Sequence, residues 1–179
     1  MKVTKIETPR QFFDHVVDPD VSDFLAAQID LRLGYHASIS LWSLREWVVG
    51  THKGQHWSNN GKSKPVFNSN TDLQRALSEI DSRFDIISDL ANAAKHLKLT
   101  KGWTKLRGNA NVAIITTNVI SNTGQLGSQL LNTGRFNQVG DVMTEQWMAV
   151  DIDQGLFDVV DCVVSTHSIW RSLINENSW

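Results

Sequence analysis

The chain has 179 residues, of which 41% are hydrophobic, and its 17 lysine and arginine residues nearly balance 19 aspartate and glutamate residues. This composition excludes global disorder, and the small negative charge excludes a strongly basic nucleic-acid-binding chain. The single cysteine, Cys162, excludes an internal disulfide. No apolar run approaches the roughly 18 residues of a membrane span, and the N-terminal residues lack the apolar core of a signal peptide. We therefore expect one cytoplasmic domain, residues 1–179, with no membrane contact.

Two segments near the N-terminus begin with a capping residue followed by proline. Thr8 and Pro9 predict a helix over residues 9–16, since threonine caps helices and proline suits the first helical turn. Asp18 and Pro19 repeat this signature, with the acidic side chain at the positive end of the helix dipole. They predict a second helix start.

A broad helical stripe follows over residues 19–49, because apolar residues recur there every three or four positions. One helix of that length would extend more than roughly 40 Å at 1.5 Å per residue, which is long for this domain. We therefore expect either one continuous helix or a break near residues 30–34, where Asp30 and Gly34 lie.

The middle of the chain is predicted as a loop followed by a helix. Residues 50–70 are rich in glycine, asparagine, serine and lysine and show no period, which is typical of a loop. Apolar residues then recur at helical spacing over residues 72–97, after a capping-box pattern that starts at Thr71. We expect one amphipathic helix there.

The pattern changes in the second half of the chain. Residues 110–121 are β-branched and predict a strand, and residues 142–152 alternate loosely and predict its return strand. Residues 98–107 are a candidate third strand, and residues 121–141 indicate an exposed connection. Apolar spacing over residues 156–174 predicts the last helix. The predicted fold is mainly α, a helical bundle with a small antiparallel β-hairpin or sheet inserted before the last helix.

Seven tryptophans are unusual for this length. Tryptophan has a large apolar body and one N–H, so it suits cores and interfaces alike. Trp57 lies in the predicted polar loop and Trp179 is the last residue, and both are candidates for a subunit interface as much as for the core. We expect a homodimer.

The predicted helix over residues 72–97 carries a polar stripe. Asp85, Asp89, Asn92 and His96 fall within roughly 60° of arc, nearly opposite the apolar face. One interpretation is a solvated helix face. The other is a functional stripe, in which a carboxylate orients an imidazole and an amide positions a ligand, with Lys95 alongside.

A second stripe of Arg32, His36 and Ser40 lies at four-residue spacing on the preceding helix. If the two long helices pack antiparallel, His36 and His96 come near each other. Together with Asp30 and Asp89 they would offer imidazole and carboxylate ligands for a transition metal. The spacing alone does not require a metal, so we predict no cofactor. If one is bound, the predicted ligands are His36, Asp89 and His96.

Asn92-x-x-x-His96 resembles the motif that lies late in a bundle helix of the HEPN superfamily. The resemblance covers about five residues. It implies an all-helical core and membership of a group that contains metal-independent RNases as well as domains that only bind nucleotides or partners. The family motif places an arginine directly before the polar residue, where this chain has Ala91. That departure implies a protein without robust catalysis, because the arginine would steady a phosphate transition state.

Two hypotheses for function follow. The first is a HEPN-like binding or regulatory module that engages RNA, a nucleotide or a protein partner through Asp89, Asn92, Arg32 and Lys95. The second is a divergent RNase or metal-assisted hydrolase, with His36 and His96 as catalytic residues.

A basic loop and one apolar-face residue complete the candidates. Lys53, Lys62 and Lys64 near Trp57 could contact a phosphate backbone and stack a base, although a solvated loop is the simpler interpretation. Cys162 is predicted to be an inert core thiol.

Overall fold

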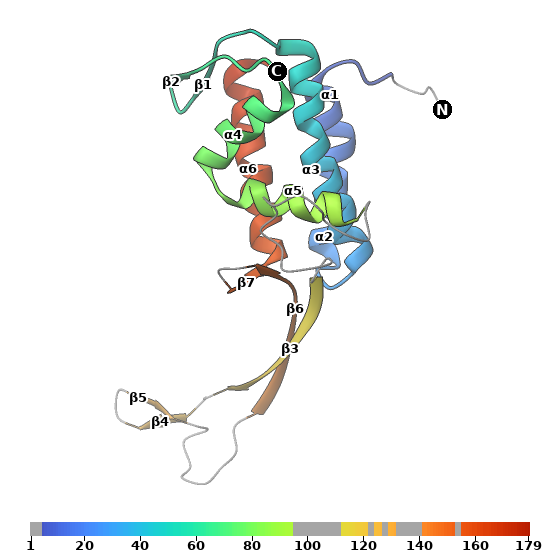
Figure 1. The fold of residues 1–179 in the computed structure, drawn as a ribbon. Coiled ribbons are helices and arrows are strands. Elements are labelled where there is room, and N and C mark those ends of the chain that lie inside the picture. Colours follow the sequence, from blue (N-terminus) through green and yellow to red (C-terminus); the bar gives the residue numbers. More distant parts are fainter. Residues whose placement is uncertain (1–4, 95–111, 122–123, 127–128, 132–140, 153–154) are drawn as a thin grey trace.

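The computed structural model describes residues 5–94, 112–121, 124–126, 129–131, 141–152 and 155–179, and helices dominate it (Figure 1). The predicted class is confirmed, because a helical bundle carries an antiparallel sheet before its last helix. The helical elements are α1 (Pro9–Phe12), the π-helical turn η1 (Phe13–Val17), α2 (Asp18–Ala26), α3 (Leu31–His52), α4 (Asn70–Ile80), α5 (Arg83–Ala93) and α6 (Val159–Asn177). The strands are β1 (Trp57–Asn59), β2 (Lys62–Lys64), β3 (Val112–Ser121), β4 (Gly124–Leu126), β5 (Gln129–Leu131), β6 (Asp141–Ile152) and β7 (Gly155–Asp158).

The N-terminal segment is one continuous rod of α1, η1 and α2, so the prediction of a helix ending at residue 16 is wrong. Thr8 caps it as predicted, and its Oγ1 accepts from the backbone N–H of Gln11 at 3.1 Å. Asp18 is the first residue of α2, as the second predicted helix start indicates, but it does not interrupt the rod, since its backbone is helical with φ −57° and ψ −48°. Its N–H donates to the carbonyl of Phe13, the i to i−5 bond of a π turn. Pro19 follows directly and has no N–H to continue an α ladder, so the register widens there rather than breaking.

The stripe over residues 19–49 is divided into two helices, so the broken alternative is the correct one, although the break lies at residues 27–30 rather than 30–34. Helix α2 ends at Ala26, and Asp30 caps α3 with a side-chain oxygen that accepts from the N–H groups of Arg32 and Leu33 at 2.9 and 3.3 Å. Gly34 lies inside α3 and plays a packing role: a Cβ there would sit 2.6 Å from the sulfur of Met148 on β6.

The predicted single helix over residues 72–97 is instead two helices, α4 and α5. Ser69, not Thr71, caps α4. Asp81 leaves the helical conformation with φ −154° and ψ 120°, and its carboxylate accepts from the N–H of Arg83 at 2.9 Å. Figure 1 shows α5 crossing the bundle at a steep angle to α3 and α6. Both helices pack an apolar face against the same core. The apolar residues therefore keep their helical spacing through the turn between α4 and α5, and the sequence pattern does not indicate that the helix is broken there.

Helix α6 passes through the centre of the bundle and contacts α2, α3 and α5 as well as β1. Trp170 is fully buried on it, donates its indole N–H to the carbonyl of Leu41 at 3.1 Å and packs edge-on against Phe84. The helix begins at Val159 and ends at Asn177, three residues later at each end than predicted, because residues 155–158 form β7.

The predicted loop over residues 50–70 contains a small hairpin of β1 and β2. Asn60 and Gly61 form its turn with φ angles of 53° and 71°, as a type I′ turn requires. Trp57 and Trp179 pack against each other beneath it, with ring centroids 5.8 Å apart and only 3% and 4% of their surfaces exposed. Of the two alternatives, the core is therefore the correct one for both side chains.

The sheet before α6 has the order β3-β6-β7, with all pairs antiparallel. Its register runs from Val112 opposite Val150 to Ser121 opposite Asp141, which confirms the two predicted strands. The connection predicted over residues 121–141 includes the paired strands β4 and β5. The candidate strand over residues 98–107 lies outside the described residues.

We expect Gly34→Val to lower the free energy of unfolding by about 1–3 kcal/mol, because the new side chain would displace the buried Met148 side chain. Gly50 is the matched control in the same helix, since a Cβ there meets nothing within 4 Å. Gly50→Ala should raise the free energy of unfolding by about 0.5–1 kcal/mol through helix propensity. Urea denaturation measures both, and a Gly34 variant as stable as the parent would contradict the packing argument.

Candidate functional site

The structure places the predicted stripe of α5 largely inside the protein. Asp89 is 7% exposed and Asn92 is half-buried, because α5 packs against α3, α4 and α6. The interpretation of this stripe as a solvated face is therefore wrong for Asp89. Lys95 and His96 lie outside the described residues, so the hypotheses that depend on them stay predictions.

The stripe on α3 divides into an exposed and a buried part. Arg32 and His36 are exposed, and Arg32 lies 3.6 Å from the carboxylate of Asp30. Ser40 is buried and donates to the carbonyl of Ala37. Within the described part of the chain, no three histidine, cysteine, aspartate or glutamate side chains gather to hold a metal ion. Of the predicted ligand set, His36 is exposed and Asp89 is buried.

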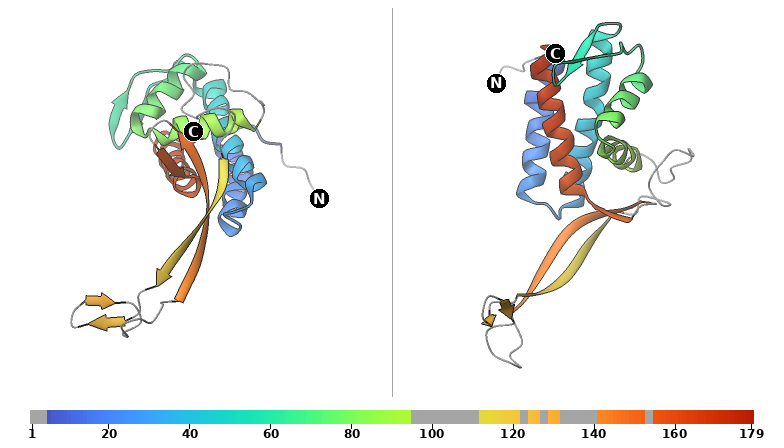
Figure 2. Two further views of the ribbon diagram at one scale, coloured as in Figure 1. Left: turned by 60° about the horizontal axis from the view of Figure 1, so that its bottom comes forward. Right: turned by 90° about the vertical axis from the view of Figure 1, so that its left-hand side faces the viewer.

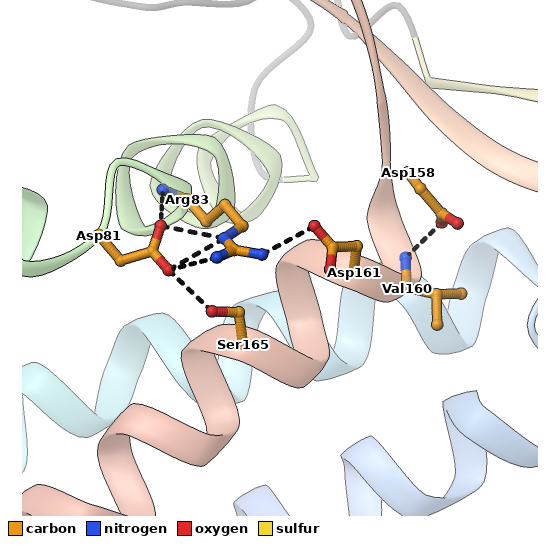
Figure 3. Close-up of polar contacts among 6 residues, drawn as sticks. All are labelled: Asp81, Arg83, Asp158, Val160, Asp161 and Ser165. Carbon is orange, nitrogen blue, oxygen red and sulfur yellow. Dashed lines mark hydrogen bonds and ion pairs between the residues drawn. The ribbon is translucent and has the colours of Figure 1, made fainter.

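A polar cluster absent from the sequence-based predictions joins the α4–α5 corner to α6 (Figure 3). The carboxylate of Asp81 accepts from Nε of Arg83 at 2.9 Å and from Oγ of Ser165 at 2.7 Å, while Nη1 of Arg83 contacts Asp161 at 2.8 Å. Burial alone would raise the pKa of Asp81, but the hydrogen bonds from Arg83 and Ser165 outweigh it and hold the pKa below its ordinary value. Every member is engaged within the cluster, so its role is structural.

A second cluster joins α2 to the opposite flank of α6. The carboxylate of Asp18 contacts Nε2 of His167 at 2.5 Å and Nη2 of Arg171 at 2.8 Å. The His167 ring stacks on Phe13 with centroids 5.1 Å apart. Burial opposes ionisation of Asp18, but the hydrogen bonds with His167 and Arg171 lower its pKa overall. Asp18, the first residue of α2, therefore also supplies a tertiary contact.

Two further sequence candidates have a packing role. Cys162 is buried, and its burial raises the pKa of the thiol to about 12, so it is a protonated core side chain at neutral pH, as predicted. Trp57 is buried and donates its indole N–H to the carbonyl of Pro65. It therefore offers no ring for base stacking beside Lys62 and Lys64.

The most distinctive surface feature is a two-stranded ribbon that leaves the helical body (Figures 1 and 2). At its base Met148, Ala149 and Val150 are buried, whereas Gln146 is already exposed. Five more antiparallel pairs follow, joining residues 117–121 to residues 141–145. We call these ten residues the outer ribbon. Both views in Figure 2 show it pointing away from the helices.

A second uncovered feature lies at the same end of the bundle. Leu25, Ile29 and Leu31 are 37%, 46% and 39% exposed and surround the turn between α2 and α3. We call these three residues the α2–α3 corner. Met148 at the base of β6 lies close to this corner, because a Cβ on Gly34 of α3 would meet both Met148 and Phe24 of α2.

Comparison with known proteins supplies no relative: no family model, no curated protein and no solved structure matches the chain. Among the described residues, no helix combines the length and apolar character needed to cross a bilayer.

We expect Asp81→Asn to lower the free energy of unfolding at pH 7 by about 1–3 kcal/mol, because Arg83 and Ser165 lose a charged acceptor. Asp161→Asn is the matched control: it removes the other carboxylate of Arg83, which is 63% exposed, and should cost less than about 1 kcal/mol.

The Asp81 effect should depend on pH. Since the folded-state pKa of Asp81 is lowered, its stabilising contribution is complete above the unfolded pKa near 4 and is lost as the pH falls below that value. Urea denaturation at pH 7 and at about pH 3 should therefore show the gap between parent and Asp81→Asn closing on acidification. A gap that stays constant would contradict the assignment.

Proposed function

We propose that this chain is a protein-binding module and that the outer ribbon is the element that contacts its partner. The proposal rests on one observation: the sheet extends well beyond the residues that the helical bundle buries. Met148 to Val150 are covered by the bundle, but the register continues for five further pairs beyond the exposed Gln146.

The stability of the outer ribbon is limited by its own few contacts. Five paired residues extend about 17 Å at roughly 3.4 Å per residue. A two-stranded hairpin with neither face covered is marginally stable in water, because it buries little apolar surface and leaves two strand edges unpaired. A partner that covers the ribbon or pairs with a strand edge would supply the missing stabilisation.

The charge of the ribbon sequence favours protein over nucleic acid as the partner. Residues 112–121 and 141–152 contain no lysine or arginine, whereas they include Asp141, Glu145 and Asp151. Binding to RNA depends on cationic side chains that neutralise phosphates. The hypotheses of an RNase or of a nucleotide-binding module rest on Lys95 and His96 and stay predictions.

The experiment removes the outer ribbon and keeps the body. In the variant, an Asn-Gly turn joins Thr116 directly to Gln146, which are opposite each other in the register. Because the buried base of the sheet is retained, the helical circular dichroism should be unchanged. We expect the parent chain to bind a protein partner, detected by light scattering and mass spectrometry of the purified material, and the variant to lose it.

The absorbance ratio at 260 and 280 nm distinguishes the other classes of partner. Nucleic acid retained by both the parent and the ribbon-deleted variant would contradict the proposal and favour binding through the segment that follows α5. Unchanged protein binding by the variant would also contradict it.

A further inference from the structure

We infer that the partner is a second copy of this chain, with the outer ribbon of each protomer packed on the α2–α3 corner of the other. This inference rests on the proposed function, because it names the partner of the same ribbon. It assigns a recipient surface that the ribbon itself does not reveal.

The first support is the distribution of exposed apolar side chains. Leu25, Ile29 and Leu31 are three of the five large hydrophobic side chains that are exposed among the residues whose burial the structure describes. Scattered exposed side chains are normal, but these three gather around one turn, and grouped apolar side chains of this kind mark interaction sites. The other two, Val66 and Val164, are separated from each other in the sequence and belong to different elements.

The second support is the geometry of the ribbon relative to this corner. At the base of β6, Met148 lies against Gly34 of α3, and Phe24 of α2 also lies next to Gly34. The outer ribbon then points away from the bundle, as Figure 2 shows, so a protomer does not cover its own corner. A two-fold axis beside the ribbon base brings the ribbon of one copy to the corner of the other, and each contact then occurs twice.

Charge agrees with this pairing. Arg32 and His36 are exposed on α3 next to the corner, and the Arg32 side chain is 65% exposed. The nearby carboxylate of Asp30 already accepts two backbone N–H groups as a helix cap. The ribbon sequence has acidic residues and no basic residue, so its charge complements that of Arg32. Asp23 on α2 is also exposed and carries the same charge as the ribbon.

Three sets of residues make up the proposed contact. Each protomer contributes the outer ribbon, with the paired strands β4 and β5 beyond it in the hairpin. The three corner residues with Arg32 and His36 form the recipient surface.

Sedimentation equilibrium of the purified full-length chain tests the inference. We expect a mass twice the 20.1 kDa of the chain. Ile29→Glu should raise the dissociation constant at least tenfold, because it buries a charge in the apolar contact. Ile29 lies in the turn and is 46% exposed, so the variant should fold, which circular dichroism and thermal denaturation check.

Val66→Glu is the matched control. Val66 is 37% exposed and precedes α4 at the opposite end of the bundle, so the same substitution there should leave the dissociation constant unchanged. Arg32→Glu is a second variant expected to weaken the dimer, with the weakening reduced by added salt.

The outcomes separate this inference from the proposed function. A parent chain that stays monomeric from micromolar to millimolar concentration, or an Ile29→Glu variant that dimerises like the parent, overturns the inference. If such a monomer still binds a different protein and loses it on ribbon deletion, the proposed function stands and only the identity of the partner is wrong. If ribbon deletion changes no protein binding, both fail.

Discussion

The burial of Trp170 on α6 is the contact on which the rest of the fold depends. This side chain is fully buried, reaches the carbonyl of Leu41 on α3 and packs against Phe84 on α5. A buried indole N–H needs an acceptor, so the position of α6 relative to α3 is fixed by a directional bond as well as by apolar contact. The last helix in the chain therefore holds together helices that precede the sheet.

The two polar clusters extend this arrangement to both flanks of α6. Asp81 and Ser165 attach the α4–α5 corner, and Asp18 with His167 attaches α2. At the C-terminal end, the carboxylate of Glu176 accepts from the backbone of the β1–β2 turn, and burial of Trp179 completes that end of the core. The partly buried carboxylates of Asp18 and Asp81 are stable in these places because each accepts several hydrogen bonds.

The direction of the ribbon follows from the packing of side chains at its base. Gly34 lets β6 approach α3 closely enough for Met148 to be buried, and this contact sets the direction in which the strands leave the bundle. The sheet is thus anchored at one end, and at the other the outer ribbon points away from the helices. A projecting ribbon next to an exposed apolar corner presents two complementary surfaces on one chain, which is the basis for proposing self-association.

The sequence by itself determined the features that depend on neighbouring residues. Short-range hydrogen bonding and periodicity account for the helical class, the two strands of the ribbon and the caps at Thr8 and Asp30. The Asn60-Gly61 turn is also a local sequence signal, although the prediction for residues 50–70 is only a loop. Tertiary structure alone decided the break at Asp81, the burial of Asp89 and the pairing of Trp57 with Trp179. These depend on partners far away in the chain, and local patterns carry no information about which distant side chain will supply the hydrogen bond or the apolar contact.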